Sequence, residues 1–126
     1  MKILIADDSA PLRKRLVEMF SHIQGIEAVA QAQDVSEALD SVRTLQPDVL
    51  ILDVQMPGGS GFDVLQEVKQ NYPSIVAIML TNHPYPQYQQ RCAELGADYF
   101  LCKSIGLEPL IEICGRLAGV KGNAGE

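Results

Sequence analysis

The chain has 126 residues, and its 16 Asp+Glu against 10 Lys+Arg give a formal net charge of −6. This length predicts a single domain, which buries roughly two-thirds of its extended-chain surface and needs no disulfide or metal to hold its core. The acidic balance argues against a nucleic-acid surface, because neutralising phosphates requires clustered Lys and Arg. No apolar stretch approaches the roughly 20 residues that span a bilayer, so we expect no contact with a membrane.

Three cysteines, an odd number without C-x-x-C spacing, argue against a disulfide framework or a zinc site. A reducing compartment fits this pattern, and we expect the protein in the cytoplasm. Cys92, Cys102 and Cys114 fall at apolar positions of helix or strand patterns, which predicts that all three are core residues.

Four short apolar runs predict β-strands. They do not alternate with polar residues, which is typical of strands that a parallel sheet buries on both faces. A fifth, weaker candidate covers residues 26–30. The four runs are residues 3–6, 49–52, 75–80 and 99–102.

Segments of helical periodicity lie between and after these runs. Apolar residues recur at helical spacing in the ranges 12–23, 35–42, 62–68, 88–95 and 107–117. Asp34 with Glu37 three residues later forms a capping-box pattern, and Ser60 is a candidate cap for the third segment. Strand and helix alternate five times, which predicts a doubly wound α/β domain with right-handed crossovers. We expect this domain to cover residues 1–118, followed by a polar, flexible tail at residues 119–126.

Four of the predicted strands end in polar residues. Asp7 and Asp8 follow the first strand, Asp53 follows the third, Thr81 follows the fourth and Lys103 follows the fifth. In a parallel sheet these carboxyl ends share one edge, so the five side chains are expected in one crevice. Three carboxylates repel one another unless a cation is present, and oxygen ligands select Mg²⁺ or a similar hard cation. A lysine and a hydroxyl opposite the metal would bind phosphoryl oxygens, which indicates phosphoryl transfer to a carboxylate.

The loop after the third strand adds a motif. It reads D-x-x-M-P-x-x-x-G from Asp53 to Gly61. With this loop, the chain resembles the receiver domain of bacterial two-component response regulators over residues 2 to about 118. The other matching features are Asp7-Asp8, Thr81, Gly96-Ala97-Asp98, Phe100 and Lys103. The resemblance implies a flavodoxin-like fold, a five-stranded parallel sheet of order 2-1-3-4-5 with five helices.

The resemblance also implies a role for each acidic residue. Asp53 would be the phosphoacceptor. Asp8 and Asp53 would bind Mg²⁺ directly, together with the backbone carbonyl of Gln55. Asp7 would act through a bound water.

A switch is implied as well. Lys103 would pair with a phosphoryl oxygen, Thr81 would move to hydrogen-bond another, and Phe100 would follow it inward. The partners implied are a sensor histidine kinase or phosphotransfer protein and an unidentified downstream protein. The downstream partner, or a second copy in a homodimer, would bind the surface formed by the helix at 88–95, the strand at 99–102 and the helix at 107–117.

The chain departs from the family pattern beside the site. Ser104 follows Lys103 where the family usually has a proline joined by a cis peptide, and we expect this bond to remain cis. Asn82 stands where a small residue is usual, and with His83 and Gln55 it is a candidate modulator of the phosphoryl group's access or hydrolysis. Prolines 84 and 86 are expected to shorten or displace the start of the next helix.

Three other functions match parts of this pattern. A degenerate receiver that acts as a phosphorylation-independent scaffold is the main alternative, because Asn82 and Ser104 are atypical. A phosphohydrolase needs an acid two residues after its nucleophile, where this chain has Gln55. A flavodoxin-like flavin-binding domain needs a loop rich in Ser, Thr and Gly after the first strand, where the two aspartates of this chain would repel the flavin phosphate. We therefore expect no enzyme activity beyond the protein's own phosphorylation and dephosphorylation.

Overall fold

Five parallel strands form a central sheet in the computed structural model, which describes the backbone of residues 1–123 and the side chains of residues 1–119. The sheet has the order β2-β1-β3-β6-β7. Its strands are β1 (Lys2–Ala6), β2 (Ala28–Ala32), β3 (Val49–Leu52), β6 (Val76–Thr81) and β7 (Tyr99–Cys102). The helices are α1 (Ala10–Phe20), α2 (Val35–Leu45), α3 (Gly61–Asn71), α4 (Pro86–Glu94) and α5 (Glu108–Asn123). A hairpin of β4 (Gln55–Met56) and β5 (Gly59–Ser60) precedes α3, and a 3₁₀ turn η1 (Lys103–Ile105) follows β7. Because β4 and β5 form a separate hairpin, β6 and β7 are the fourth and fifth strands of the main sheet, and its order is the predicted 2-1-3-4-5. The predicted flavodoxin-like fold is confirmed.

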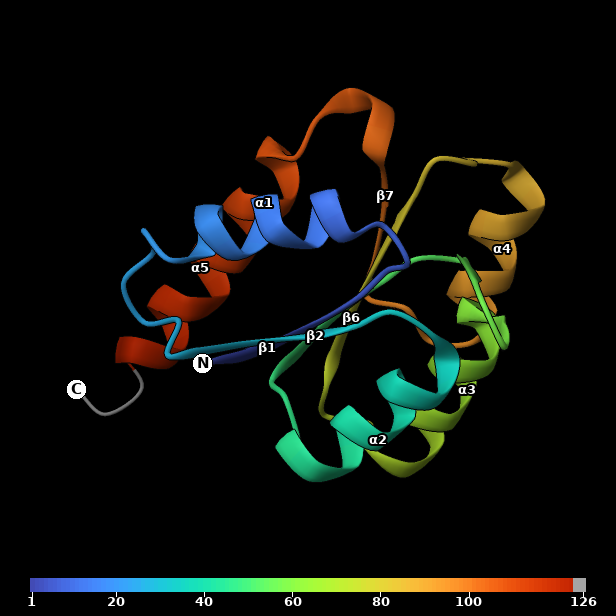
Figure 1. Ribbon diagram of the computed structural model, residues 1–126, viewed down its shortest axis with the longest axis horizontal. Coiled ribbons are helices and arrows are strands. Elements are labelled where there is room, and N and C mark those ends of the chain that lie inside the picture. The colour runs from blue at the N-terminus through green and yellow to red at the C-terminus, as the bar shows by residue number, and fades with distance from the viewer. Residues whose placement is uncertain (124–126) are drawn as a thin grey trace.

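Helices cover both faces of the sheet. Figure 1 shows α1 and α5 on one face and α2, α3 and α4 on the other. Residues of β1 alternate between the two cores, since Leu4 packs on the α2–α4 side and Ile3 and Ile5 on the α1–α5 side. Covering both faces buries most side chains of the central strands β1, β3 and β6, which is why their sequences are mainly apolar.

The second strand lies two residues later than predicted. It runs over Ala28–Ala32 instead of residues 26–30, because β1 pairs from Lys2 with Ala28 to Ala6 with Ala32. Ile26 instead packs from the preceding loop against the α1–α5 core. Small residues give this edge strand a weak pattern, so its pairing with β1 decides its limits.

Helix ends differ modestly from the predicted ranges. Helix α1 ends at Phe20, three residues early, and the chain then turns through Gly25, whose φ is +98°. Asp34 caps α2 as expected by accepting from the Glu37 N–H over 2.8 Å. Helix α5 continues to Asn123, beyond residue 118 where a tail was expected, and the last three tail residues lie outside the described ones. Among the described helices, none is long and apolar enough to cross a membrane.

The cysteines divide into two kinds. Cys92 and Cys114 are buried in the two cores as predicted, but Cys102 is half-buried and belongs to neither core, so its prediction was wrong. Strand β7 is an edge strand, and Cys102 lies at its end, where its Sγ is 2.9 Å from the Ser104 Oγ. Hydrogen bonding with Ser104 lowers the pKa of Cys102. Burial raises the pKa of Cys92 to about 11 and that of Cys114 to about 12.

These differences predict selective alkylation of the native protein. Iodoacetamide at mildly alkaline pH is expected to modify Cys102 alone, because the thiolate is the nucleophile and only Cys102 is accessible and readily ionised. Peptide mass mapping after a short exposure is the measurement. Ser104→Ala should slow the reaction, because it removes the hydrogen bond that favours the thiolate. Equal labelling of Cys92 or Cys114 before unfolding would contradict the packing described here.

Candidate functional site

The polar residues predicted at the strand ends meet at one edge of the sheet. The Asp7 N–H continues the β1–β2 ladder by donating to Ala32, and the Asp53 N–H donates to the Ala6 carbonyl, each over 3.0 Å. These two bonds place both aspartates one residue beyond neighbouring strands. Thr81 ends β6 at the same edge.

Three carboxylates form a cluster there. Asp7, Asp8 and Asp53 each offer a carboxylate oxygen, and these oxygens lie within 4.8 Å of one another. Asp7 and Asp53 are buried, with exposed fractions of 3% and 7%, whereas Asp8 is exposed. An oxygen-only donor set that is open on one side suits a hard cation such as Mg²⁺, which keeps several waters. The residues present therefore fit this metal.

Lys103 bridges two members of the cluster. Its Nζ lies 2.7 Å from the Asp7 Oδ2 and 3.0 Å from the Asp53 Oδ2. The expectation that Lys103 shares one crevice with Asp7 and Asp53 is confirmed. The expectation of a cis bond to Ser104 was wrong, because the described residues contain no cis peptide. A cis bond to a residue other than proline costs about 3–4 kcal/mol, and Lys103 reaches the cluster without it.

Burial and charge act in opposite directions on these groups. Burial raises the pKa of Asp53, and although the Lys103 charge and hydrogen bond lower it, the net shift is upward. Burial lowers the pKa of Lys103, but its hydrogen bonds and charge interactions with Asp7 and Asp53 outweigh this, so its pKa is raised. Lys103 therefore remains a cation at neutral pH inside the cluster.

The loop after β3 folds back so that Gly61 packs against the main chain of Asp53 and Val54. The Gln55 N–H donates to the Asp53 Oδ1 over 3.3 Å, and the β4–β5 hairpin then returns the chain to Gly61. The Gly61 N–H donates to the Val54 carbonyl over 2.7 Å. A Cβ at Gly61 would lie 2.0 Å from the Asp53 carbonyl oxygen. The glycine of the sequence motif is thus required by this close approach.

The two residues of the predicted switch are Thr81, at the end of β6, and Phe100, on β7. Thr81 is fully buried, and its Oγ1 accepts from the His83 N–H over 3.1 Å. Phe100 is half-buried against the α2–α4 core, while Tyr99 packs on the α1–α5 side, as alternation along β7 predicts. Asn82 is exposed beside Thr81.

Comparison with known proteins agrees with this geometry. A family model described as the response regulator receiver domain matches residues 3–114. The chain belongs to the response regulator receiver family. Domains of this family are parts of two-component response regulators, and the cluster of Asp7, Asp8 and Asp53 matches the acidic Mg²⁺ site that is typical of them.

The relatives of this receiver domain include a response regulator and an enzyme. It is 30% identical over 112 residues to the response regulator GacA of Pseudomonas syringae, covering 89% of this chain and 52% of the relative. It is 33% identical over 119 residues to a protein-glutamate methylesterase/protein-glutamine glutaminase of Methanospirillum hungatei, covering 93% of this chain and 35% of the relative. The chain thus spans about half or less of these relatives.

Solved structures of receiver domains superimpose closely. The Vibrio cholerae chemotaxis protein CheY4 has a TM-score of 0.81 at 32% identity, with 91% of this chain and 96% of that chain covered. The receiver domain of a DNA-binding response regulator from Colwellia psychrerythraea has a TM-score of 0.86 at 24% identity, with 94% and 98% covered, and supports the fold alone.

An aromatic group that the sequence patterns did not predict lies beside the receiver site. The His83 and Tyr85 rings stack at 5.7 Å, Tyr85 meets Tyr88 edge-on at 5.2 Å, and Tyr88 meets Phe62 at 5.5 Å. Pro86 begins α4, two residues before the predicted range, at a first-turn position that proline tolerates. The closely spaced aromatics flanking the prolines were the available signal, but their contacts with Phe62 depend on how α3 packs beside α4.

Proposed function

We propose that this receiver domain is a phosphorylation-dependent signalling switch whose phosphoacceptor is Asp53. The observation that carries the proposal is the buried Asp53, whose carboxylate is hydrogen-bonded to Lys103 and clustered with those of Asp7 and Asp8. The phosphodonor would be a phosphohistidine on a sensor histidine kinase or phosphotransfer protein. In the transfer, an Asp53 oxygen bonds to phosphorus while the phosphorus–nitrogen bond breaks, and the imidazole nitrogen keeps that electron pair.

The metal ligands in this proposal are Asp8, Asp53 and the backbone carbonyl of Gln55. Mg²⁺ bound there would supply positive charge to the phosphoryl oxygens. Asp7 would act through a bound water, which agrees with its two oxygens already accepting from the Ser9 N–H at 2.9 Å and from Lys103 at 2.7 Å. Lys103 would turn from Asp7 toward a phosphoryl oxygen on Asp53, whose carboxylate its ammonium already contacts.

The switch would act through Thr81 and Phe100. A phosphoryl group adds about −1.5 to −2 charge and three acceptor oxygens, and Thr81 would move inward to donate to one of them. The space that it leaves would admit the half-buried ring of Phe100. This movement would change the surface formed by α4, β7 and α5, which we propose binds the downstream protein or a second copy of the domain. Asn82, His83 and Gln55 would modulate access to the phosphoryl group. We further propose a cytoplasmic protein with no reaction on external substrates.

The test is phosphorylation by a small phosphodonor such as phosphoramidate with Mg²⁺, followed by intact mass. Wild type should gain one phosphoryl group, and Asp53→Asn or chelation of the metal should abolish the gain. Asp40→Asn is the matched control, because Asp40 is an exposed aspartate on α2 that is paired with Arg43. With beryllofluoride and Mg²⁺, amide shifts should extend to α4, β7 and α5. Absence of phosphorylation in wild type would favour the scaffold alternative, and shifts confined to the loops around Asp53 would refute the switch alone.

A further inference from the structure

The peptide group between Asp7 and Asp8 is held by a side chain that the sequence analysis left unassigned. Arg13, in the first turns of α1, donates from Nη1 to the main-chain carbonyl oxygen of Asp7 over 2.6 Å. Its Nε donates to the Gln31 Oε1 on β2 over 3.1 Å. Two bonds to different elements fix the plane of the guanidinium, so the carbonyl that it binds is fixed as well.

The orientation of Asp8 depends on this peptide group. The Asp8 carboxylate is exposed and makes no hydrogen bond or ion pair with any of the described residues. Asp7, by contrast, is held through its side chain by Ser9 and Lys103. Because nothing holds the Asp8 side chain directly, the backbone leading into it determines where its carboxylate points.

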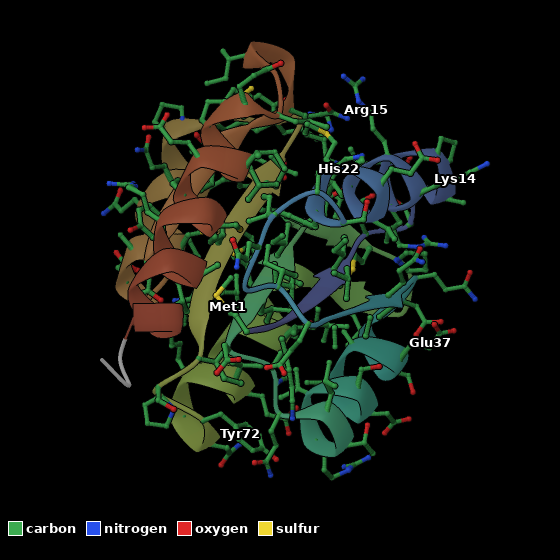
Figure 2. All side chains as sticks on the ribbon, turned by 90° about the vertical axis from the view of Figure 1, so that its left-hand side faces the viewer. Met1, Lys14, Arg15, His22, Glu37 and Tyr72 are labelled. Atoms are coloured by element: carbon green, nitrogen blue, oxygen red, sulfur yellow. The ribbon has the colours of Figure 1, made fainter. Side chains whose placement is uncertain are left out.

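Arg13 does not act as a direct counter-ion. Its guanidinium has no carboxylate within ion-pair distance in the part of the chain whose side chains are described. The next two residues, Lys14 and Arg15, are exposed, and Figure 2 shows their side chains on the outer side of α1, directed away from the sheet. Of these three consecutive cations, only Arg13 contacts the acidic loop.

We propose that Arg13 is a positioning residue that orients the Asp7–Asp8 peptide so that Asp8 can bind the metal. This inference rests on the proposed Mg²⁺ site. Positioning and charge have opposite consequences for metal affinity. If Arg13 acted only as a nearby positive charge, removing it would strengthen Mg²⁺ binding by reducing repulsion. If it positions Asp8, removing it weakens binding, and loss of such supporting contacts typically costs 10–100-fold in metal affinity.

The experiment compares Mg²⁺ titrations of metal-free wild type, Arg13→Gln and Arg15→Gln by amide chemical shifts. Arg13→Gln is expected to weaken binding by about tenfold and to shift the Asp8 amide before metal is added. Arg15→Gln removes the same charge from the same helix without touching Asp7, and its dissociation constant should stay within about twofold of wild type. Gln31→Ala, at an exposed strand position, removes only the hydrogen bond that Gln31 accepts from Arg13 and should weaken Mg²⁺ binding by about threefold. This variant replaces Arg13→Gln in the test if Arg13→Gln does not fold.

Unchanged or tighter Mg²⁺ binding in Arg13→Gln, with normal binding in wild type, would overturn the positioning role and leave the proposed function intact. If Arg13→Gln does not fold, unchanged binding in Gln31→Ala would overturn the role in the same way. Equal weakening in Arg15→Gln would also overturn it, because the effect would then follow charge or helix stability. Absence of binding in wild type would refute the metal site and this inference together.

Discussion

Gly61→Ala is expected to lower the free energy of unfolding by about 3 kcal/mol. The new Cβ would lie 2.0 Å from the Asp53 carbonyl oxygen and 2.9 Å from both the Asp53 carbonyl carbon and the Val54 Cα. All three are backbone atoms of the loop that carries the phosphoacceptor, so no side chain can rotate away to make room. The loop must shift, and the 2.7 Å bond from the Gly61 N–H to Val54 is lost or weakened with it. Chemical denaturation measures the loss, and phosphorylation of Asp53 should slow in the same variant.

Gly115→Ala is the matched control. Gly115 lies within α5, and a Cβ there meets nothing within 4 Å. Alanine favours a helix over glycine by about 1 kcal/mol, so this variant should be more stable than wild type. If the same substitution lowers stability at Gly61 and raises it at Gly115, the loss at Gly61 comes from crowding in the loop and not from helix propensity. A loss below about 0.5 kcal/mol in Gly61→Ala would show that the loop yields easily, contrary to this prediction.

Lys103→Met is expected to destabilise the metal-free domain by about 3 kcal/mol at neutral pH. The Lys103, Asp7 and Asp53 side chains are only 13%, 4% and 9% exposed, so removing the ammonium leaves two buried carboxylates without a cation. Mg²⁺ should reverse much of the loss, because it binds the same carboxylates and stabilises the folded state by mass action. Thermal unfolding with and without millimolar Mg²⁺ measures both effects.

The pH dependence of this deficit follows from Asp53. Its pKa is already raised by burial, and removing Lys103 removes the interactions that lower it. A carboxyl whose folded-state pKa is raised destabilises the fold as pH increases through that pKa and takes up a proton below it. The deficit of Lys103→Met should therefore shrink as the solution is made mildly acidic.

Lys69→Met provides the comparison for Lys103→Met. Lys69 also pairs with a carboxylate, at 2.8 Å from the Asp98 Oδ2, but Asp98 is 40% exposed and lies away from the cluster. Lys69→Met should therefore destabilise the domain less than Lys103→Met, and this destabilisation should not depend on Mg²⁺. A similar response to Mg²⁺ in both variants would mean that the metal acts elsewhere on the domain.

The sequence by itself determined the central strands and the strand ends. Apolar runs identify β1, β3, β6 and β7, because helices cover both faces of the sheet that these strands form. Because the carboxyl ends of parallel strands share one edge of a sheet, the sequence alone predicts that Asp7, Asp53 and Lys103 lie close together. The D-x-x-M-P-x-x-x-G motif from Asp53 to Gly61 then indicated the receiver family.

Only the tertiary structure decided the finer contacts. The limits of β2 depend on its register with β1, since its small residues carry little periodic signal. The peptide bond after Lys103 is trans, and the Lys103 Nζ lies closer to Asp7 than to Asp53. Both features depend on the path that η1 takes as it leaves the sheet. Arg13 reaches the Asp7 carbonyl because α1 packs beside the ends of β1 and β2. Periodicity reports how deeply a residue is buried, whereas the partner of a long polar side chain is set by elements that are distant in the sequence.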